Sequence, residues 1–181
     1  MSLPHALLTA LAERTGSGSE LAARFDKSIG YFWQATHQQI YRELARLEES
    51  GFIESLPEEA TRGRKRAYRI LPAGKRELKR WIVQAHEPAG MRDELMVRIR
   101  AEAAIGPTGL DKQIRQRRAS HEEKLAHYRD IEARDFPAGV PQGRETALQH
   151  HVLKAGIRFE VNWIEFLTEV LEVLERPVDK R

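Results

Sequence analysis

Residues 36–50 combine an apolar face and a polar face at the spacing of an α-helix. Ile40, Leu44 and Leu47 recur every three or four residues and form a face that a folded core would cover. The N-terminal turn and the opposite face carry side chains that form hydrogen bonds, namely Thr36, His37, Gln38, Gln39, Tyr41 and Arg42. Glutamine amides pair with adenine edges, and arginine binds guanine edges or phosphates. The face therefore suits the major groove of duplex DNA.

The N-terminal turn of such a helix usually enters the groove first. We therefore expect His37, Gln38 and Gln39 to face base edges, while Thr36 caps the helix and Tyr41 donates its hydroxyl to a phosphate. Glu48 and Glu49 should face away from the DNA. Taken alone, however, this segment fits an ordinary surface helix with two glutamines better than a helix that reads DNA.

A cluster of cations follows at Arg62, Arg64, Lys65 and Arg66, around Gly63. Residues 62–80 hold nine Lys or Arg and one Glu, a net charge of +8, whereas residues 43–59 hold six Glu and one Arg, a net charge of −5. Clustered cations repel one another, and DNA phosphates offset this repulsion by releasing counterions. We expect the cluster to bind phosphates, with an arginine at its tip reaching a minor groove. A solvated basic loop is the alternative.

These side chains need a scaffold, and the order of elements in residues 1–87 supplies one. Helical apolar patterns are centred on Leu7, Phe25 and Leu44, and the run 16–18 separates the first two, with Ser19 as the expected cap of the second helix. Residues 52–56 and 67–70 read as two strands joined by a polar loop, and a basic helix follows Pro72. The order helix, helix, helix, hairpin, helix predicts a winged helix-turn-helix that presents residues 36–50 and the basic loop to DNA.

Residues 88–181 are predicted to be helical, with breaks at 106–109 and 136–141. The last helix, residues 144–175, is the most apolar, and its stripe includes Leu148, Val152, Ala155, Phe159, Phe166 and Val170. One thin domain cannot cover so broad an apolar surface, so we interpret residues 88–181 as a helical dimerisation domain. A two-fold dimer would set two DNA-reading helices about 34 Å apart. Burial of the stripe within one chain is the alternative.

Signals for bound small molecules are weak. Trp81, Phe159 and Trp163 could wall a pocket for a small aromatic effector at the domain or dimer junction, although plain core packing explains them more simply. His150 and His151 are adjacent on a helix and point about 100° apart, so we predict no metal site and no cofactor. Arg117 and Arg118 should lie on a solvated face.

The first half of the chain resembles the PadR-like transcriptional regulators. The residues that carry the resemblance are the leucine-rich first helix, Ser19-Glu20-Leu21, Gly30-Tyr31-Phe32-Trp33, QIYRELARLEESGFI at 39–53 and GRKRAYRILPAG at 63–74. Family members often have Pro one or two positions after the helix tyrosine and Thr before the Ala-Gly that follows the wing. Arg42-Glu43 and Pro72 stand at these positions here, which affects local contacts. The helical second half is similar to the longer-tailed subgroup. The resemblance implies a homodimer that occupies an operator, usually represses a neighbouring gene and in some members is released by an inducer.

Composition and motifs narrow the other classes of function. The chain has no cysteine, no export signal and no apolar run near the roughly 20 residues of a membrane span, so we expect a cytoplasmic protein. A nucleophile elbow, a phosphate-binding glycine loop and a metal-ligand cluster are all missing from the sequence, so we do not expect an enzyme. The remaining alternative is a winged-helix module that binds another protein instead of specific DNA, which would leave the basic loop unexplained.

Overall fold

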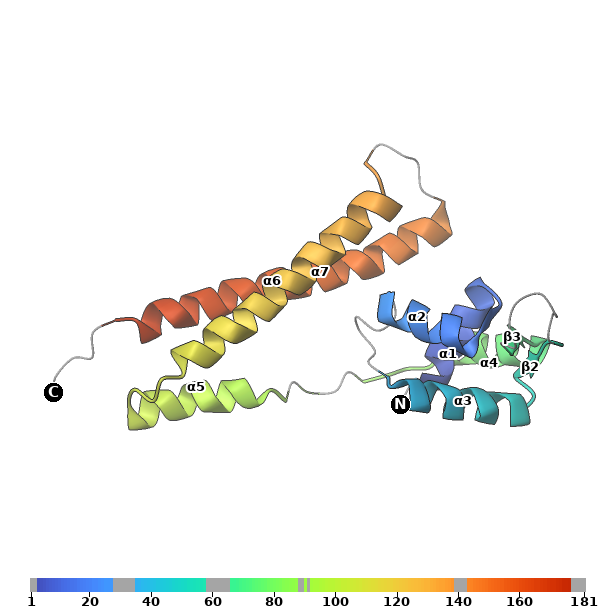
Figure 1. Ribbon diagram of the computed structural model, residues 1–181, viewed down its shortest axis with the longest axis horizontal. Coiled ribbons are helices and arrows are strands. Elements are labelled where there is room, and N and C mark those ends of the chain that lie inside the picture. Colours follow the sequence, from blue (N-terminus) through green and yellow to red (C-terminus); the bar gives the residue numbers. More distant parts are fainter. Residues whose placement is uncertain are drawn as a thin grey trace. The chain divides into compact units, whose positions relative to one another are not determined.

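The computed structural model describes residues 3–27, 35–57, 66–87, 90, 92–138 and 143–176, with the backbone alone for 26 and 27 (Figure 1). The elements are α1 (Leu3–Glu13), β1 (Gly16–Ser17), α2 (Gly18–Lys27), α3 (His37–Glu49), β2 (Ile53–Ser55), β3 (Ala67–Ile70), α4 (Pro72–Ile82), α5 (Glu94–Ile105), α6 (Asp111–Asp135) and α7 (Arg144–Leu174). Contacts divide the chain into two compact units, Met1–Pro88 and Ala89–Arg181. The prediction of a mainly helical chain with a small β-hairpin is confirmed.

One apolar core holds the first unit together. Three helices bury the residues that the sequence pattern placed inside, which are Leu7, Leu8, Leu11, Leu21, Ala22, Phe25, Ile40, Leu44 and Leu47. Ile53, Tyr68 and Ile70 join this core from the sheet. The burial of Ile40, Leu44 and Leu47 leaves the opposite face of α3 exposed, as the two-faced pattern predicts.

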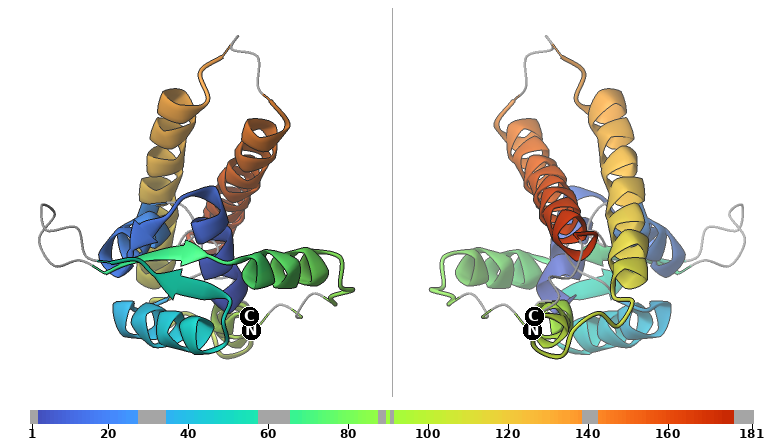
Figure 2. Two further views of the ribbon diagram at one scale, coloured as in Figure 1. Left: turned by 90° about the vertical axis from the view of Figure 1, so that its right-hand side faces the viewer. Right: turned by 90° about the vertical axis from the view of Figure 1, so that its left-hand side faces the viewer.

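The predicted hairpin belongs to a three-stranded antiparallel sheet of order β1-β3-β2 (Figure 2, left). In the hairpin, Ile53 lies opposite Ile70 and Ser55 lies opposite Tyr68. The other edge of β3 pairs with β1, where Gly16 lies opposite Tyr68. The sequence interpretation of residues 16–18 as a plain helix break was therefore incomplete, because two residues of this break form a strand.

The N-cap of α2 is Ser17, and the prediction of Ser19 was wrong. The Ser17 hydroxyl accepts a hydrogen bond from the Glu20 backbone N–H at 3.2 Å, and the Glu20 carboxylate accepts from the Ser17 N–H at 2.7 Å. This reciprocal arrangement satisfies two backbone donors at the helix start. Hydrogen bonds that the carboxylate accepts from the backbone and side chain of Ser17 hold the pKa of Glu20 below its usual value.

A close backbone approach fixes the start of α4 against the turn that leads into β2. A Cβ atom added at Gly74 would lie 2.3 Å from the carbonyl oxygen of Phe52, which already accepts the Leu71 N–H at 2.9 Å. Only glycine fits there without a shift of the helix or the turn. The position of α4 is therefore set at its first turn.

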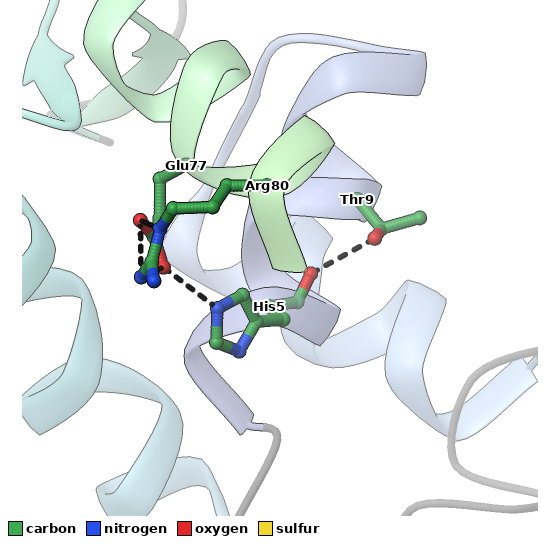
Figure 3. A network of polar contacts seen from close by, with 4 residues as sticks. All are labelled: His5, Thr9, Glu77 and Arg80. Carbon is green, nitrogen blue, oxygen red and sulfur yellow. Dashed lines mark hydrogen bonds and ion pairs between the residues drawn. The ribbon is translucent and has the colours of Figure 1, made fainter. Parts of the chain in front are cut away.

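The last turns of α4 are held against α1 by polar contacts, which Figure 3 shows, and by an aromatic stack. His5 Nε2 lies 3.2 Å from Glu77 Oε1, and Arg80 donates hydrogen bonds to both oxygens of that carboxylate. The His5 ring stacks on Trp81 with the ring centroids 4.4 Å apart, and the Thr9 hydroxyl donates to the His5 carbonyl oxygen. Trp81 thus packs within the first unit.

The second unit is built on α6 and α7, which run in opposite directions along one another (Figures 1 and 2). The stripe predicted on the long polar helix is buried, at Leu110, Ile114, Leu125, Tyr128 and Ile131. From α7 the buried residues are Glu160, Trp163, Leu167 and Leu171. Because α7 must turn this edge toward α6, its other edge remains uncovered.

The short helix α5 completes the core of the second unit. Its N-cap Asp93 accepts a hydrogen bond from the Leu95 N–H, and Leu95 packs in the cluster that includes Ile114 and Leu167. The helix ends at Gly106, whose φ of 92° lies in the left-handed region that favours glycine. The predicted break at 106–109 is confirmed.

Candidate nucleic-acid interface

A complete capping box orders the N-terminal turn of α3. The Thr36 hydroxyl accepts from the Gln39 N–H at 3.2 Å, and the Gln39 side-chain oxygen accepts from the Thr36 N–H at 2.9 Å. The cap predicted for Thr36 is therefore confirmed. The bond also engages Gln39, because its side-chain oxygen is part of the helix cap.

The exposed face of α3 brings together His37, Gln38, Tyr41 and Arg42. The ring of Tyr41 packs over the start of α2, because a Cβ added at Gly18 would lie 2.3 Å from Tyr41 Cε1. This contact joins the two helices of the helix-turn-helix and holds the tyrosine in place. Contacts from these residues to DNA stay predictions.

The basic loop at residues 62–66 is the predicted wing of the winged helix-turn-helix. Three of its four cations, Arg62, Arg64 and Lys65, lie outside the described residues. The fourth, Arg66, directly precedes β3 and is engaged. Its Nη2 donates to both Glu48 oxygens at 3.1 and 3.0 Å and to the Ser55 hydroxyl at 2.9 Å. Arg66 is therefore not a free cation.

Hydrogen bonds from Ser55, supplemented by Arg66, hold the pKa of Glu48 below its usual value. The carboxylate is accordingly ionised at neutral pH and compensates the Arg66 charge. The Arg66 guanidinium also lies over the Tyr68 ring, 5.8 Å from its centroid, and burial raises the pKa of that tyrosine.

Ion pairs compensate part of the positive charge in the described part of the basic stretch, residues 62–80. Arg69 pairs with Glu54 directly across the β2–β3 ladder. Lys75, Arg76 and Lys79 on α4 are exposed and form no ion pair with the described residues. Within the described part of the stretch, the uncompensated cations thus lie on α4 and not on the strands.

The predicted dimer stripe on α7 divides into two parts. Leu148, Val152 and Phe159 are 52%, 52% and 57% exposed, and Ala155 between them is also exposed. Phe166 and Val170, in contrast, are half-buried and pack against the core of their own chain. The sequence pattern did not distinguish these two parts, because both fall at the same helical spacing.

Of the predicted effector residues, Trp81 belongs to the first unit, and Phe159 and Trp163 belong to the second. Trp163 is buried and stacks on His121, with the ring centroids 5.4 Å apart. The Arg117 guanidinium lies 4.4 Å from the centroid of the indole, and Phe159 approaches Trp163 edge-on at 6.3 Å. The prediction of one shared pocket stays untested.

The expectation that Arg117 lies on a solvated face was wrong. Arg117 donates to both carboxylate oxygens of Asp93 and is partly buried over Trp163. These hydrogen bonds keep the pKa of Asp93 below its usual value. The other member of the pair, Arg118, lies 3.3 Å from Glu122.

Sequence reasoning also missed a buried polar pair, in which His121 Nδ1 contacts the carboxylate of Glu160. One signal was present: His121 falls in the gap of the predicted α6 stripe, between Ile114 and Leu125. The pair joins α6 to α7 in the middle of their contact.

His150 lies 2.7 Å from Glu132 and stacks on Phe136. Within the described residues, no three His, Asp or Glu side chains are placed to hold a metal ion. No helix among those described is long and apolar enough to cross a bilayer.

Comparison with known proteins identifies the family. Residues 7–80 match the model of the transcriptional regulator PadR-like family, and residues 91–175 match the model described as virulence activator alpha C-term. "Probable transcriptional regulator Rv1176c" of Mycobacterium tuberculosis is 38% identical, over 97% of this chain and 98% of its own length. The negative transcriptional regulator PadR of Bacillus subtilis is 25% identical, over 96% and 98%.

Solved structures agree over the whole fold. The Vibrio cholerae virulence activator AphA superposes with a TM-score of 0.80 at 31% identity, covering 96% of this chain and 98% of its own. Bacillus subtilis PadR in complex with operator DNA gives a TM-score of 0.83 at 24% identity, with the same coverage, and supports the fold. The winged-helix unit, the helical second unit and these matches together show that the chain belongs to the PadR-like family of transcriptional regulators.

Proposed function

We propose that this chain binds double-stranded operator DNA as a homodimer and represses a neighbouring gene. The observation that carries the proposal is α3 itself. Its N-terminus is capped, its apolar face is buried in a winged-helix core, and its opposite face presents His37, Gln38 and Arg42 to solvent. A helix fixed in this way loses little conformational freedom when it enters a major groove.

The proposed contacts divide between two tasks. Gln38 and His37, with the NH₂ group of Gln39, read base edges. Tyr41 and Arg42 bind phosphates, which position the helix without reading sequence. The wing cations Arg62, Arg64 and Lys65 add affinity that is independent of sequence.

The exposed part of the α7 stripe supports the homodimer. Leu148, Val152 and Phe159 are large apolar residues on one edge of a long helix, and the small Ala155 between them allows close approach of a second helix. The double variant Val152→Glu/Phe159→Glu should be monomeric in sedimentation equilibrium, since each carboxylate would be buried in an apolar interface. Gln149→Glu, an exposed position on the same helix, should leave the dimer intact. A double variant that still dimerises would contradict this interface.

We also propose that a small aromatic acid binds beside Phe159 and Trp163. The exposed ring of Phe159 supplies a stacking surface, and the Arg117 guanidinium, which is paired with Asp93, covers the indole of Trp163. One structure of Bacillus subtilis PadR contains p-coumaric acid, which is a suitable probe. It should quench the tryptophan fluorescence of the wild type and not of Trp163→Phe. Equal quenching of both proteins would exclude this site.

The DNA-binding proposal is tested by titrating the dimer against the duplex upstream of its own gene at several salt concentrations. If Arg42, Arg62, Arg64 and Lys65 of both protomers each neutralise one phosphate, eight cations act, and the slope of log K against log salt should reach about −7. Arg64→Ala/Lys65→Ala should weaken binding to all sequences and flatten the slope. Binding that is absent or insensitive to salt would contradict the proposal and favour a module that binds another protein.

The sign of regulation needs a separate assay, because the relatives include both a negative regulator and an activator. A reporter gene under the upstream region should be expressed more strongly when the gene for this chain is deleted. Lower expression after deletion would show activation.

A further inference from the structure

We propose that Glu48 and Arg66 are positioning residues, which fasten the base of the wing to the last turn of α3, and that Arg66 does not serve as a phosphate contact. This inference rests on the proposed function in one respect, namely that α3 and the wing engage the same DNA. From the charge pattern alone, Glu48 would be interpreted as an anion that repels DNA and Arg66 as a wing cation that binds it. The contacts give both residues a different role.

The geometry supports a fastening role. The Glu48 carboxylate reaches from α3 to β2 and to the residue that precedes β3, because Oε1 accepts the Ser55 backbone N–H at 3.0 Å and both oxygens accept from Arg66 Nη2. Arg66 Nη2 also donates to the Ser55 hydroxyl, so the three residues form a closed set of contacts. One carboxylate therefore links α3, the end of β2 and the residue that precedes β3.

The fastening lies at the open end of the described hairpin. Ser55 is the last residue of β2, and the next backbone bond, from the Leu56 N–H to the Ala67 carbonyl oxygen at 2.8 Å, is the last that the structure describes before residues 58–65. Arg66 is the first described residue after that gap. The contacts with Glu48 thus hold the two described ends of the hairpin, at Ser55 and Arg66, against α3.

Simple electrostatics and a fastening role predict opposite signs for the loss of Glu48. If Glu48 only repelled phosphates, its removal would strengthen DNA binding, as would the removal of any nearby carboxylate. If Glu48 holds the wing, its removal must weaken binding despite the gain in positive charge. Glu49 offers a matched control, because it is the adjacent carboxylate of α3, is exposed and forms no hydrogen bond or ion pair with the described residues.

The experiment compares full-length Glu48→Ala and Glu49→Ala on the fluorescently labelled duplex upstream of the gene, in one buffer. Glu49→Ala should bind as tightly as the wild type or more tightly. Glu48→Ala should bind about fivefold more weakly, the size expected for one charge-assisted contact at a partly exposed position. Arg66→Gln should lose a similar factor, and adding it to Glu48→Ala should cost little more, because both changes break the same contacts.

Equal or tighter binding by Glu48→Ala than by Glu49→Ala would overturn the inference. So would a full additional loss on adding Arg66→Gln to Glu48→Ala, because Arg66 would then act on DNA directly. Thermal unfolding of each variant verifies that the fold is retained.

A second readout needs no DNA. The Ser55 amide should exchange its hydrogen about tenfold faster in Glu48→Ala than in Glu49→Ala, because its acceptor is gone. Equal exchange rates would also overturn the inference. If the wild type failed to bind the duplex, the proposed function would be wrong, and amide exchange would still decide whether Glu48 fastens the hairpin.

Discussion

Removal of one member of the buried pair His121–Glu160 should strongly destabilise the second unit. The two side chains are 8% and 5% exposed, so each would be left buried without its polar partner. Removal of one partner leaves a buried polar group unsatisfied, which costs about 1–3 kcal/mol and more when that group is charged. Typical domains are stable by only about 5–15 kcal/mol, so His121→Ala or Glu160→Ala should remove a large share of the total.

Replacing both residues should cost far less than the two single losses together. In His121→Leu/Glu160→Met, apolar side chains of similar size fill the space and no unpaired polar group remains, so the free energy of unfolding should stay within about 1 kcal/mol of the wild type or exceed it. The exposed Glu165 on the same helix provides the control, and Glu165→Ala should change stability by at most about 0.5 kcal/mol.

Urea unfolding at one fixed protein concentration measures these differences, because dimerisation would couple stability to concentration. Trp163 stacks on His121 and reports the local transition by its fluorescence. Single variants that each lose less than about 1 kcal/mol would show that the pair is not desolvated, and the reasoning would fail. A double variant as unstable as the sum of the singles would refute it equally.

Three further outcomes follow from local contacts. Thr36→Ala removes the cap of α3 and should lower the free energy of unfolding by about 1 kcal/mol in urea titrations; no loss would show that the cap is dispensable. Gly74→Ala places a Cβ 2.3 Å from the Phe52 carbonyl oxygen and should cost about 1–3 kcal/mol by the same assay. Asp93→Asn keeps a cap but loses the ion pair with Arg117. Because the folded pKa of Asp93 is lowered, its contribution is present above the ordinary value of 3.8 and is lost as pH falls through the folded pKa. The variant should therefore be less stable than the wild type at pH 7, and the two should converge in acid unfolding curves well below that value.

Periodic patterns predicted the helices and most of the core. The apolar residues of α1, α2, α3 and α6 are buried as their spacing indicated, because helical periodicity is local. The strand β1 was missed because two small residues, Gly16 and Ser17, carry no strand pattern and pair only through a partner distant in sequence. The cap of α2 was displaced by two residues, since Ser17 and Ser19 are chemically equivalent and only the Glu20 contact distinguishes them.

The candidate site was predicted in outline but not in its pairings. Residue type identified the polar face of α3, whereas the engagement of Gln39 in a capping box depends on a specific rotamer. The pairing of Arg66 with Glu48 depends on the register of the hairpin against the helix. A count of charges along the sequence treats both arginine and glutamate as free, and it therefore misassigns them.

The central claim is that the exposed face of α3 reads base sequence, and selection of bound duplexes from a random pool tests it most directly. The wild type should enrich a two-fold symmetric motif with half-sites about one DNA turn, or 34 Å, apart. Gln38→Ala should enrich a motif that is altered at one position in each half-site and unchanged at the other positions. Failure of the wild type to enrich any motif, or identical motifs for the wild type and Gln38→Ala, would contradict the account.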